Sequence, residues 1–77
     1  MHDTTLVGID LGKHSFHLHG QSDNGKQTLR KKVTRKRLLE FIVTAKACTV
    51  VMEACARAHR MARTLAAFGH TVKLISP

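Results

Sequence analysis

A short apolar run that ends on an acidic residue is the feature that most constrains this chain. Leu6, Val7 and Ile9 form a segment of strand length that is rich in β-branched side chains. Asp10 follows where the run stops, and a carboxylate at the end of a central strand is costly to bury unless water, a partner or a metal ion compensates its charge. Ligands of open α/β sheets bind at the carboxyl ends of the strands. The sequence therefore predicts that Asp10 is one half of a site.

A second apolar run, residues 49–52, ends in the same way on Glu53. If the two strands are parallel neighbours, their axes lie about 4.8 Å apart, and Asp10 and Glu53 end at the same edge of the sheet. Two carboxylates this close repel each other unless they share a cation or a proton. Because Mg²⁺ binds one or two carboxylates together with water and phosphate oxygens, the pair favours a metal-dependent nuclease or strand-transfer site. The alternative is that Asp10 only shapes a turn and Glu53 caps the helix after it.

The order of elements is expected to be β-β-β-α-β-α-β, which gives an α/β fold. Residues 15–21 alternate between apolar and polar side chains, as a half-buried strand does, and Asn24-Gly25 supplies the positive φ angles of a hairpin turn. Thr34 is a predicted helix N-cap and Gly69 a helix stop. Right-handed crossovers through the helices place the last two strands parallel to the first. The expected elements are, in order, residues 4–10, 15–21, 26–34, 35–45, 48–53, 54–68 and 71–75.

The charge balance favours a polyanionic partner. The chain has 13 Lys and Arg against 5 Asp and Glu, a formal net charge of +8 with histidines neutral. Such an excess is typical of nucleic-acid binding, although a merely soluble basic surface has the same composition. The three aromatic residues are all Phe, so no stacking platform for single strands is evident. The candidate phosphate contacts are Lys13, Arg30, Lys32, Arg35, Lys36 and Arg37, and Lys13 is equally well explained as a solvated turn residue.

The histidines and cysteines are given structural interpretations. No acid or cysteine stands at ligand spacing beside His14, His17 and His19, so these side chains are expected to be solvated or to face nucleic acid. Cys48 and Cys55 lack a C-x-x-C spacing and are expected to be buried thiols. Two cysteines without a disulfide framework indicate a reducing cytoplasm.

The length of the chain and its apolar runs limit its organisation. Its 77 residues form one domain at most, and the sequence stops at Ser76-Pro77 directly after a predicted strand, so we expect a fragment of a longer protein. No apolar run approaches the roughly 20 residues that cross a bilayer, and no signal peptide precedes the first strand. The expected location is cytoplasmic, without membrane contact.

Several segments together resemble the N-terminal part of the DEDD transposases of the insertion-sequence-110 family. The resemblance covers essentially the whole chain, and its most specific part is the Met-Glu-Ala-Cys stretch with the Ala-His and Ala-Arg pairs after it. One departure is that Ala56 and Arg57 stand where family members often have small residues, commonly glycines. The matching segments are residues 7–14, 51–55, 58–59, 62–63, Leu65 and 69–75.

The resemblance implies that residues 1–77 are the N-terminal portion of an RNase H-like (RuvC-like) nuclease domain, with sheet order 3-2-1-4-5 and an antiparallel strand 2. Asp10 and Glu53 would be the first two acids of the DEDD set, which holds Mg²⁺ in a two-metal site. The two later aspartates and a serine nucleophile would lie beyond Pro77, so this chain by itself is expected neither to cut nor to join DNA. The family also implies DNA and a structured guide RNA as partners, and a homo-oligomer; uncovered surface of the sheet is a further reason to expect self-association.

Two other functions fit parts of the sequence. Residues 7–12, Val-Gly-Ile-Asp-Leu-Gly, also resemble the first hairpin of sugar-kinase, actin and chaperone ATPases, in which residues 12–15 would hold ATP phosphates. The basic charge and the Met-Glu-Ala-Cys stretch disfavour that assignment. The second alternative is a non-catalytic nucleic-acid-binding module, which needs no acid pair and would contact phosphates through Arg30, Lys32, Arg35, Lys36 and Arg37.

Overall fold

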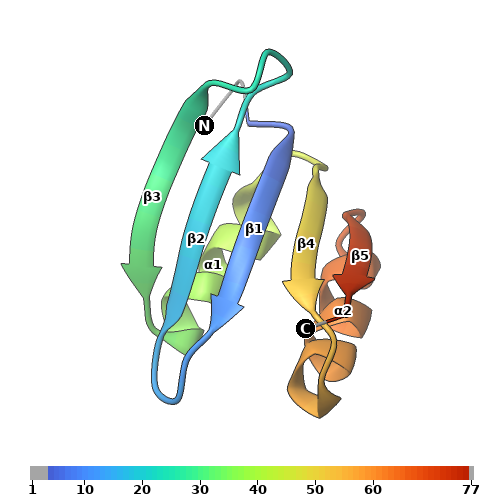
Figure 1. The fold of residues 1–77 in the computed structure, drawn as a ribbon. Helices are drawn as coiled ribbons and strands as arrows, with labels where there is room; N and C mark the ends of the chain where they lie inside the picture. Colours follow the sequence, from blue (N-terminus) through green and yellow to red (C-terminus); the bar gives the residue numbers. More distant parts are fainter. Residues whose placement is uncertain (1–3, 77) are drawn as a thin grey trace.

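The structure, a computed structural model, describes residues 4–76 and contains five strands and two helices (Figure 1). All seven predicted elements are confirmed in the predicted order, and their ends differ from the predictions by at most two residues. Pro77, at which the sequence stops, lies outside the described residues. The elements are β1 (Leu6–Leu11), β2 (Phe16–Gln21), β3 (Gln27–Val33), α1 (Arg35–Thr44), β4 (Thr49–Glu53), α2 (Ala56–Ala67) and β5 (Thr71–Ile75).

The strands form one mixed sheet in the order β3-β2-β1-β4-β5. β2 is antiparallel to both β1 and β3, whereas β4 runs parallel to β1 and β5 runs parallel to β4. This confirms the predicted order and the antiparallel second strand. β3 lies at one edge, where its consecutive charges Arg30, Lys31 and Lys32 discourage pairing with another sheet.

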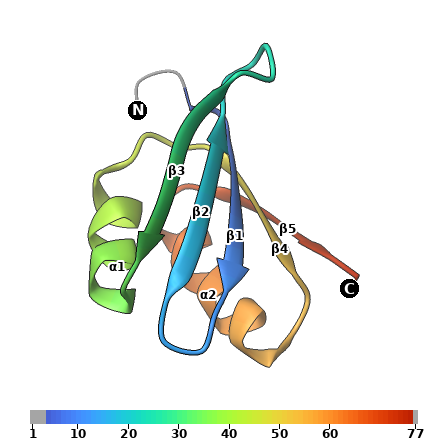
Figure 2. The same ribbon diagram turned by 60° about the vertical axis from the view of Figure 1, so that its left-hand side comes forward.

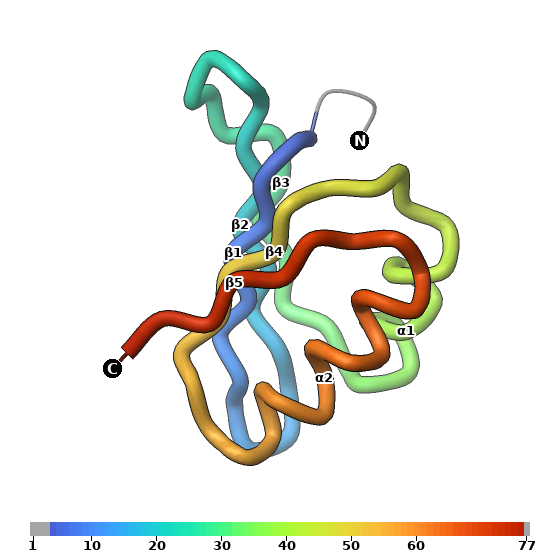
Figure 3. Tube along the Cα trace, turned by 90° about the vertical axis from the view of Figure 1, so that its right-hand side faces the viewer, coloured from blue at the N-terminus to red at the C-terminus, as the bar shows by residue number. Residues whose placement is uncertain are grey.

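Both helices pack on the same face of the sheet (Figures 2 and 3). This follows from the two right-handed crossovers, β3 to β4 and β4 to β5, which both move in the same direction across the sheet. Neither helix within residues 4–76 is long and apolar enough to cross a bilayer. The opposite face of the sheet, here called the open face, is covered by neither helix. The buried core between helices and sheet consists of Val7, Ile9, Phe16, Leu18, Leu29, Leu38, Ile42, Val50, Met52, Ala58, Met61 and Leu65.

The predicted hairpin turn and cap signals are confirmed, except that Gly25 alone, and not Asn24, has a positive φ angle in this turn. Gly25 has a φ of 80° and its N–H donates to the carbonyl oxygen of Ser22 at 2.9 Å, which closes the hairpin. The hydroxyl oxygen of Thr34 accepts a hydrogen bond from the N–H of Arg37 at 3.3 Å and caps α1. Gly69 has a φ of 92° directly after α2, a conformation that a glycine adopts without strain.

The predicted start of α2 and the predicted burial of Cys55 are wrong for a single reason. Cys55 is the N-cap of α2: its backbone is extended and its Sγ accepts a hydrogen bond from the N–H of Ala58 at 3.4 Å. A capping residue lies at the end of the helix outside the packed core, so this thiol is exposed and the helix begins at Ala56. Cys48 is half-buried, and this burial raises the pKa of its thiol, which disfavours the reactive thiolate.

His70 is a buried polar side chain that connects three segments. Its Nδ1 lies 3.3 Å from the backbone nitrogen of Cys48, and its Nε2 lies 3.0 Å from the carbonyl oxygen of Ile42. Because the backbone N–H of Cys48 must donate, Nδ1 accepts and Nε2 carries the proton that is donated to Ile42. The imidazole thereby joins α1, the start of β4 and the turn that precedes β5.

We expect His70→Ala to lower the free energy of unfolding by about 1–3 kcal/mol, because the substitution removes the hydrogen-bond partners of two backbone groups in the interior. Urea denaturation followed by circular dichroism measures the change. His59→Ala, on the exposed side of α2, is the matched control and should change the value by less than about 0.5 kcal/mol. Similar effects of the two substitutions would contradict the structural role of His70.

Candidate functional site

Asp10 and Glu53 lie near the carboxyl ends of the two central parallel strands. The hydrogen-bonded register of β1 and β4 pairs Gly8 with Val51, so two residues further along each strand Asp10 and Glu53 reach the same level of the sheet. The paired ladder ends at Gly8 and Val51, and beyond that point the strand ends separate (Figure 1). Both acids are exposed and both line a cavity of about 190 Å³ at this edge. The structure therefore brings the two predicted acids to one place.

Among residues 4–76 neither carboxylate has a lysine or arginine side chain as an ion-pair partner. Within residues 4–76 Arg37 forms an ion pair with Glu40, and the Nε2 of His19 lies 3.7 Å from the Oδ2 of Asp10. The side chain of Asp10 is 76% exposed, so water screens this contact. His19 was predicted only to be solvated or to face nucleic acid; its contact with Asp10 depends on the hairpin register, which the sequence alone does not specify.

The donor set fits a partial magnesium site. Two neighbouring carboxylates beside an open cavity are ligands that Mg²⁺ takes when water and phosphate oxygens complete its coordination. In the described part of the chain, no group of three or more His, Cys, Asp or Glu side chains is placed to hold a metal ion. Asp10 and Glu53 would therefore hold a cation with water, phosphate oxygens or further ligands completing its coordination.

The turn between β1 and β2 lies next to Asp10 and is held by α2. The N–H of Gly12 donates to the carbonyl oxygen of Ser15 at 2.8 Å, and the Nη1 of Arg57 donates to the carbonyl oxygen of Gly12 at 2.9 Å. The guanidinium of Arg57 also lies 5.7 Å from the centre of the Phe16 ring, a cation–π contact. The Gly12 N–H is therefore already hydrogen-bonded within the turn and is not free to donate to an ATP phosphate. Sequence reasoning missed Arg57, because its partner is 45 residues away.

The candidate phosphate contacts come from three separate segments of the chain. They fall into three groups, which share exposure to solvent but lie on different elements. Arg30 and Lys32 on β3 point to the open face, because side chains alternate between the two faces along a strand and Leu29 is buried on the helix-covered face. The groups are Lys13 in the turn between β1 and β2, Arg30 and Lys32 on β3 opposite His19 and His17, and Arg35, Lys36 and Arg37 in the first turn of α1.

Comparison with known proteins identifies relatives over the whole chain. The chain is 53% identical over 77 residues to the transposase for insertion sequence element IS1328 of Yersinia enterocolitica. The match covers all of this chain and 23% of that protein. The chain is a relative of insertion-sequence transposases. It is also 39% identical over 71 residues, 92% of this chain, to the probable family 20 transposase of Pseudomonas aeruginosa. It is 35% identical over all 77 residues to the transposase for insertion sequence element IS1111A of Coxiella burnetii. The chain covers 21% of each of these two proteins.

These relatives confirm the resemblance to insertion-sequence-110 transposases. The chain spans about a fifth of the length of the curated relatives that it matches. No family model and no solved structure matches it.

The two glycines of this transposase relative that flank Asp10 are expected to respond differently to alanine. A Cβ on Gly12 would lie 2.6 Å from the carbonyl oxygen of Ser15, whereas a Cβ on Gly8 would meet only the carbonyl oxygen of His19 at 3.9 Å. Gly12→Ala should therefore lower the free energy of unfolding by about 1–3 kcal/mol through overpacking. Gly8→Ala should change it by less than about 1 kcal/mol in either direction.

Urea denaturation of both variants under identical conditions measures the difference. Equal destabilisation by Gly12→Ala and Gly8→Ala would contradict the close approach of Gly12 to Ser15.

Proposed function

We propose that this chain supplies the first two carboxylates of a Mg²⁺-dependent DNA-cleaving site in an insertion-sequence transposase. The observation that carries the proposal is that Asp10 and Glu53 line one cavity at the carboxyl ends of adjacent parallel strands. The relationship to named transposases supports DNA as the substrate, and the reaction would be the strand cleavage and exchange that moves an insertion sequence.

We further propose that the fold is RNase H-like, of the RuvC type. The sheet order β3-β2-β1-β4-β5, the antiparallel β2 and the two crossover helices on one face support this assignment. In such a fold the central strand carries the first acid, which is the position that Asp10 occupies on β1.

Asp10 and Glu53 would hold the metal ion, together with the two later aspartates that the family resemblance places beyond Pro77. Bound Mg²⁺ would supply charge stabilisation for the attacking and leaving oxygens of a phosphodiester. Arg57 fixes the turn beside Asp10 through the carbonyl of Gly12 and so limits where the end of β1 can move. His19, at 3.7 Å from Asp10, lies beside the carboxylate on the open face.

The basic groups would hold the nucleic acid. Arg30 and Lys32 project from the same open face as Asp10, and Lys13 lies in the turn after it, so a phosphate backbone could contact them while it approaches the acids. The chain's net charge of +8 favours such contacts at low salt. A structured guide RNA and a homo-oligomeric assembly belong to the same proposal, since they rest on the family resemblance.

A second candidate function is nucleic-acid binding without cleavage. It is favoured by the finding that residues 4–76 contain no group of three or more His, Cys, Asp or Glu side chains placed to hold a metal ion. Under this alternative the basic groups would act and the acids would be dispensable for binding.

The acid pair makes stability depend on Mg²⁺ in a defined way. We expect Mg²⁺ at ten times its Kd to raise the free energy of unfolding by about 1.4 kcal/mol, because the ion binds only the folded arrangement of the two acids. Glu53→Gln should abolish this gain and leave the metal-free protein no less stable, since it removes a like charge near Asp10. Urea denaturation in EDTA and in Mg²⁺ measures both effects.

Asp23→Asn is the matched control, because Asp23 lies in the turn between β2 and β3, at the opposite end of the sheet. It should leave the Mg²⁺-dependent gain unchanged. A gain that survives Glu53→Gln, or one that is never observed, would contradict a cation site shared by the two acids in this chain.

The 77-residue chain by itself is expected not to nick supercoiled plasmid DNA in Mg²⁺, because it carries two acids of the site and no nucleophile from the rest of the transposase. In the complete transposase, Asp10→Asn and Glu53→Gln should abolish cleavage, while Asp23→Asn should not. Agarose gel assays of plasmid nicking measure both. Mg²⁺-dependent nicking by the short chain that disappears in Asp10→Asn would contradict its inactivity, and full cleavage by the Glu53→Gln transposase would contradict the proposed site.

A further inference from the structure

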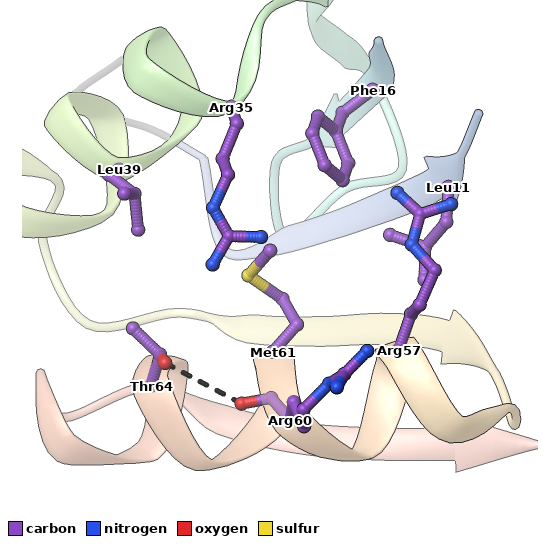
Figure 4. A pocket seen from close by; sticks show the side chains of 8 residues that line it. All are labelled: Leu11, Phe16, Arg35, Leu39, Arg57, Arg60, Met61 and Thr64. Atoms are coloured by element: carbon purple, nitrogen blue, oxygen red, sulfur yellow. Dashed lines mark hydrogen bonds between the residues drawn. The ribbon is translucent and has the colours of Figure 1, made fainter. Parts of the chain in front are cut away.

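A second cavity, of about 360 Å³, lies between α1 and α2 on the helix-covered side of the sheet (Figure 4). Three arginines line it: Arg35 from α1, and Arg57 and Arg60 from α2. Phe16 and Met61 form part of its apolar wall. We propose that this cavity binds one nucleotide of an unpaired nucleic-acid strand, with the phosphate at the arginines and the base against the apolar wall.

The charges around the cavity are not compensated within residues 4–76. No acidic residue lines it, and none of its three arginines takes part in the ion pairs of the described chain. Neither helix has an acidic residue in its first turn, where Arg35 and Arg57 stand instead at the positive ends of the helix dipoles. Cations at that end of a helix are unfavourable, so an anion in the cavity would relieve both kinds of repulsion.

The chemistry of the lining selects a nucleotide over a simple anion. Arg57 already lies over the ring of Phe16, and guanidinium groups both hold phosphates in a bidentate manner and stack on planar rings. The walls combine these groups with Leu11, Leu39 and Met61, against which a base could pack. A volume of about 360 Å³ is at the small end of ligand pockets, enough for one nucleotide-sized group.

An unpaired strand fits better than a duplex, because a duplex presents its phosphates while its bases remain stacked inside. The location also connects the cavity with the acid pair. Leu11 lines the cavity and its neighbour Asp10 projects to the open face, so the two sites lie on opposite faces at the same edge of the sheet. The inference rests on the proposed function only in that the ligand is the strand on which the transposase acts.

The test compares two arginines of α2 that differ in position relative to the cavity. Arg60 lines the cavity, whereas Arg63 is exposed and does not. Fluorescence anisotropy of a labelled single strand of oligothymidine, with the 77-residue chain in EDTA, measures the affinity. We expect Arg60→Gln to weaken binding about tenfold and Arg63→Gln less than about twofold. Equal losses would overturn the proposal, because they would indicate binding by overall charge alone.

A second measurement locates the ligand without relying on a substitution. In a sample with labelled methionine methyl groups, the strand should shift the signal of Met61, which lines the cavity, more than that of Met52, which is buried in β4 and does not line it. An unmoved Met61 signal would overturn the site. A Met61 shift produced by inorganic phosphate with the same affinity as the strand would overturn the assignment to a nucleotide.

Parallel titrations with single-stranded RNA and with duplex DNA identify the source of the ligand. Tighter binding of oligothymidine or of single-stranded RNA than of the duplex would support the site, and the tighter of the two single strands would identify the ligand as DNA or as guide-type RNA. Tighter binding of the duplex would overturn the requirement for an unpaired nucleotide. Because every titration is done without metal, failure here leaves the Mg²⁺ dependence of Asp10 and Glu53 as a separate result.

Discussion

The parallel pairing of β1 with β4 is the constraint on which the rest of the structure depends. β1 is the central strand, and its residues Val7 and Ile9 are buried against the helices, so the alternation of a strand sends Asp10 to the open face. The register that pairs Gly8 with Val51 brings Glu53 to the same level. A slip of one residue in either strand would turn its acid into the apolar core.

The two helices divide the molecule into sides with different chemistry. The open face carries Asp10, His19 and, on β3, Arg30 and Lys32, whereas three arginines line the cavity between the helices. Arg57 connects these sides, because it lines that cavity and also holds the carbonyl of Gly12 in the turn after β1. The position of the first acid is therefore linked to the packing of α2.

Much of the fold follows from local signals, and less of the site does. The alternation along β2, the Asn-Gly turn and the cap at Thr34 each act within a few residues, so they predict the elements closely. The two acids could be paired because strand ends of a parallel sheet meet at one edge. The contacts of His70 and Arg57 join residues 22 to 45 positions apart, and such partners become visible only once the packing is known. The exposure of Cys55 was missed for a related reason, since the capping role depends on where α2 begins.

The most direct test of the central claim is to locate a paramagnetic ion on the protein. Mn²⁺, added in trace amounts to the ¹⁵N-labelled chain, broadens amide signals according to their distance from the ion. A cation shared by the two strand ends predicts comparable broadening at Asp10 and Glu53, with none at Asp23 on the distant turn. Broadening at only one of the two acids, or equally at Asp23, would contradict a shared site at the ends of β1 and β4.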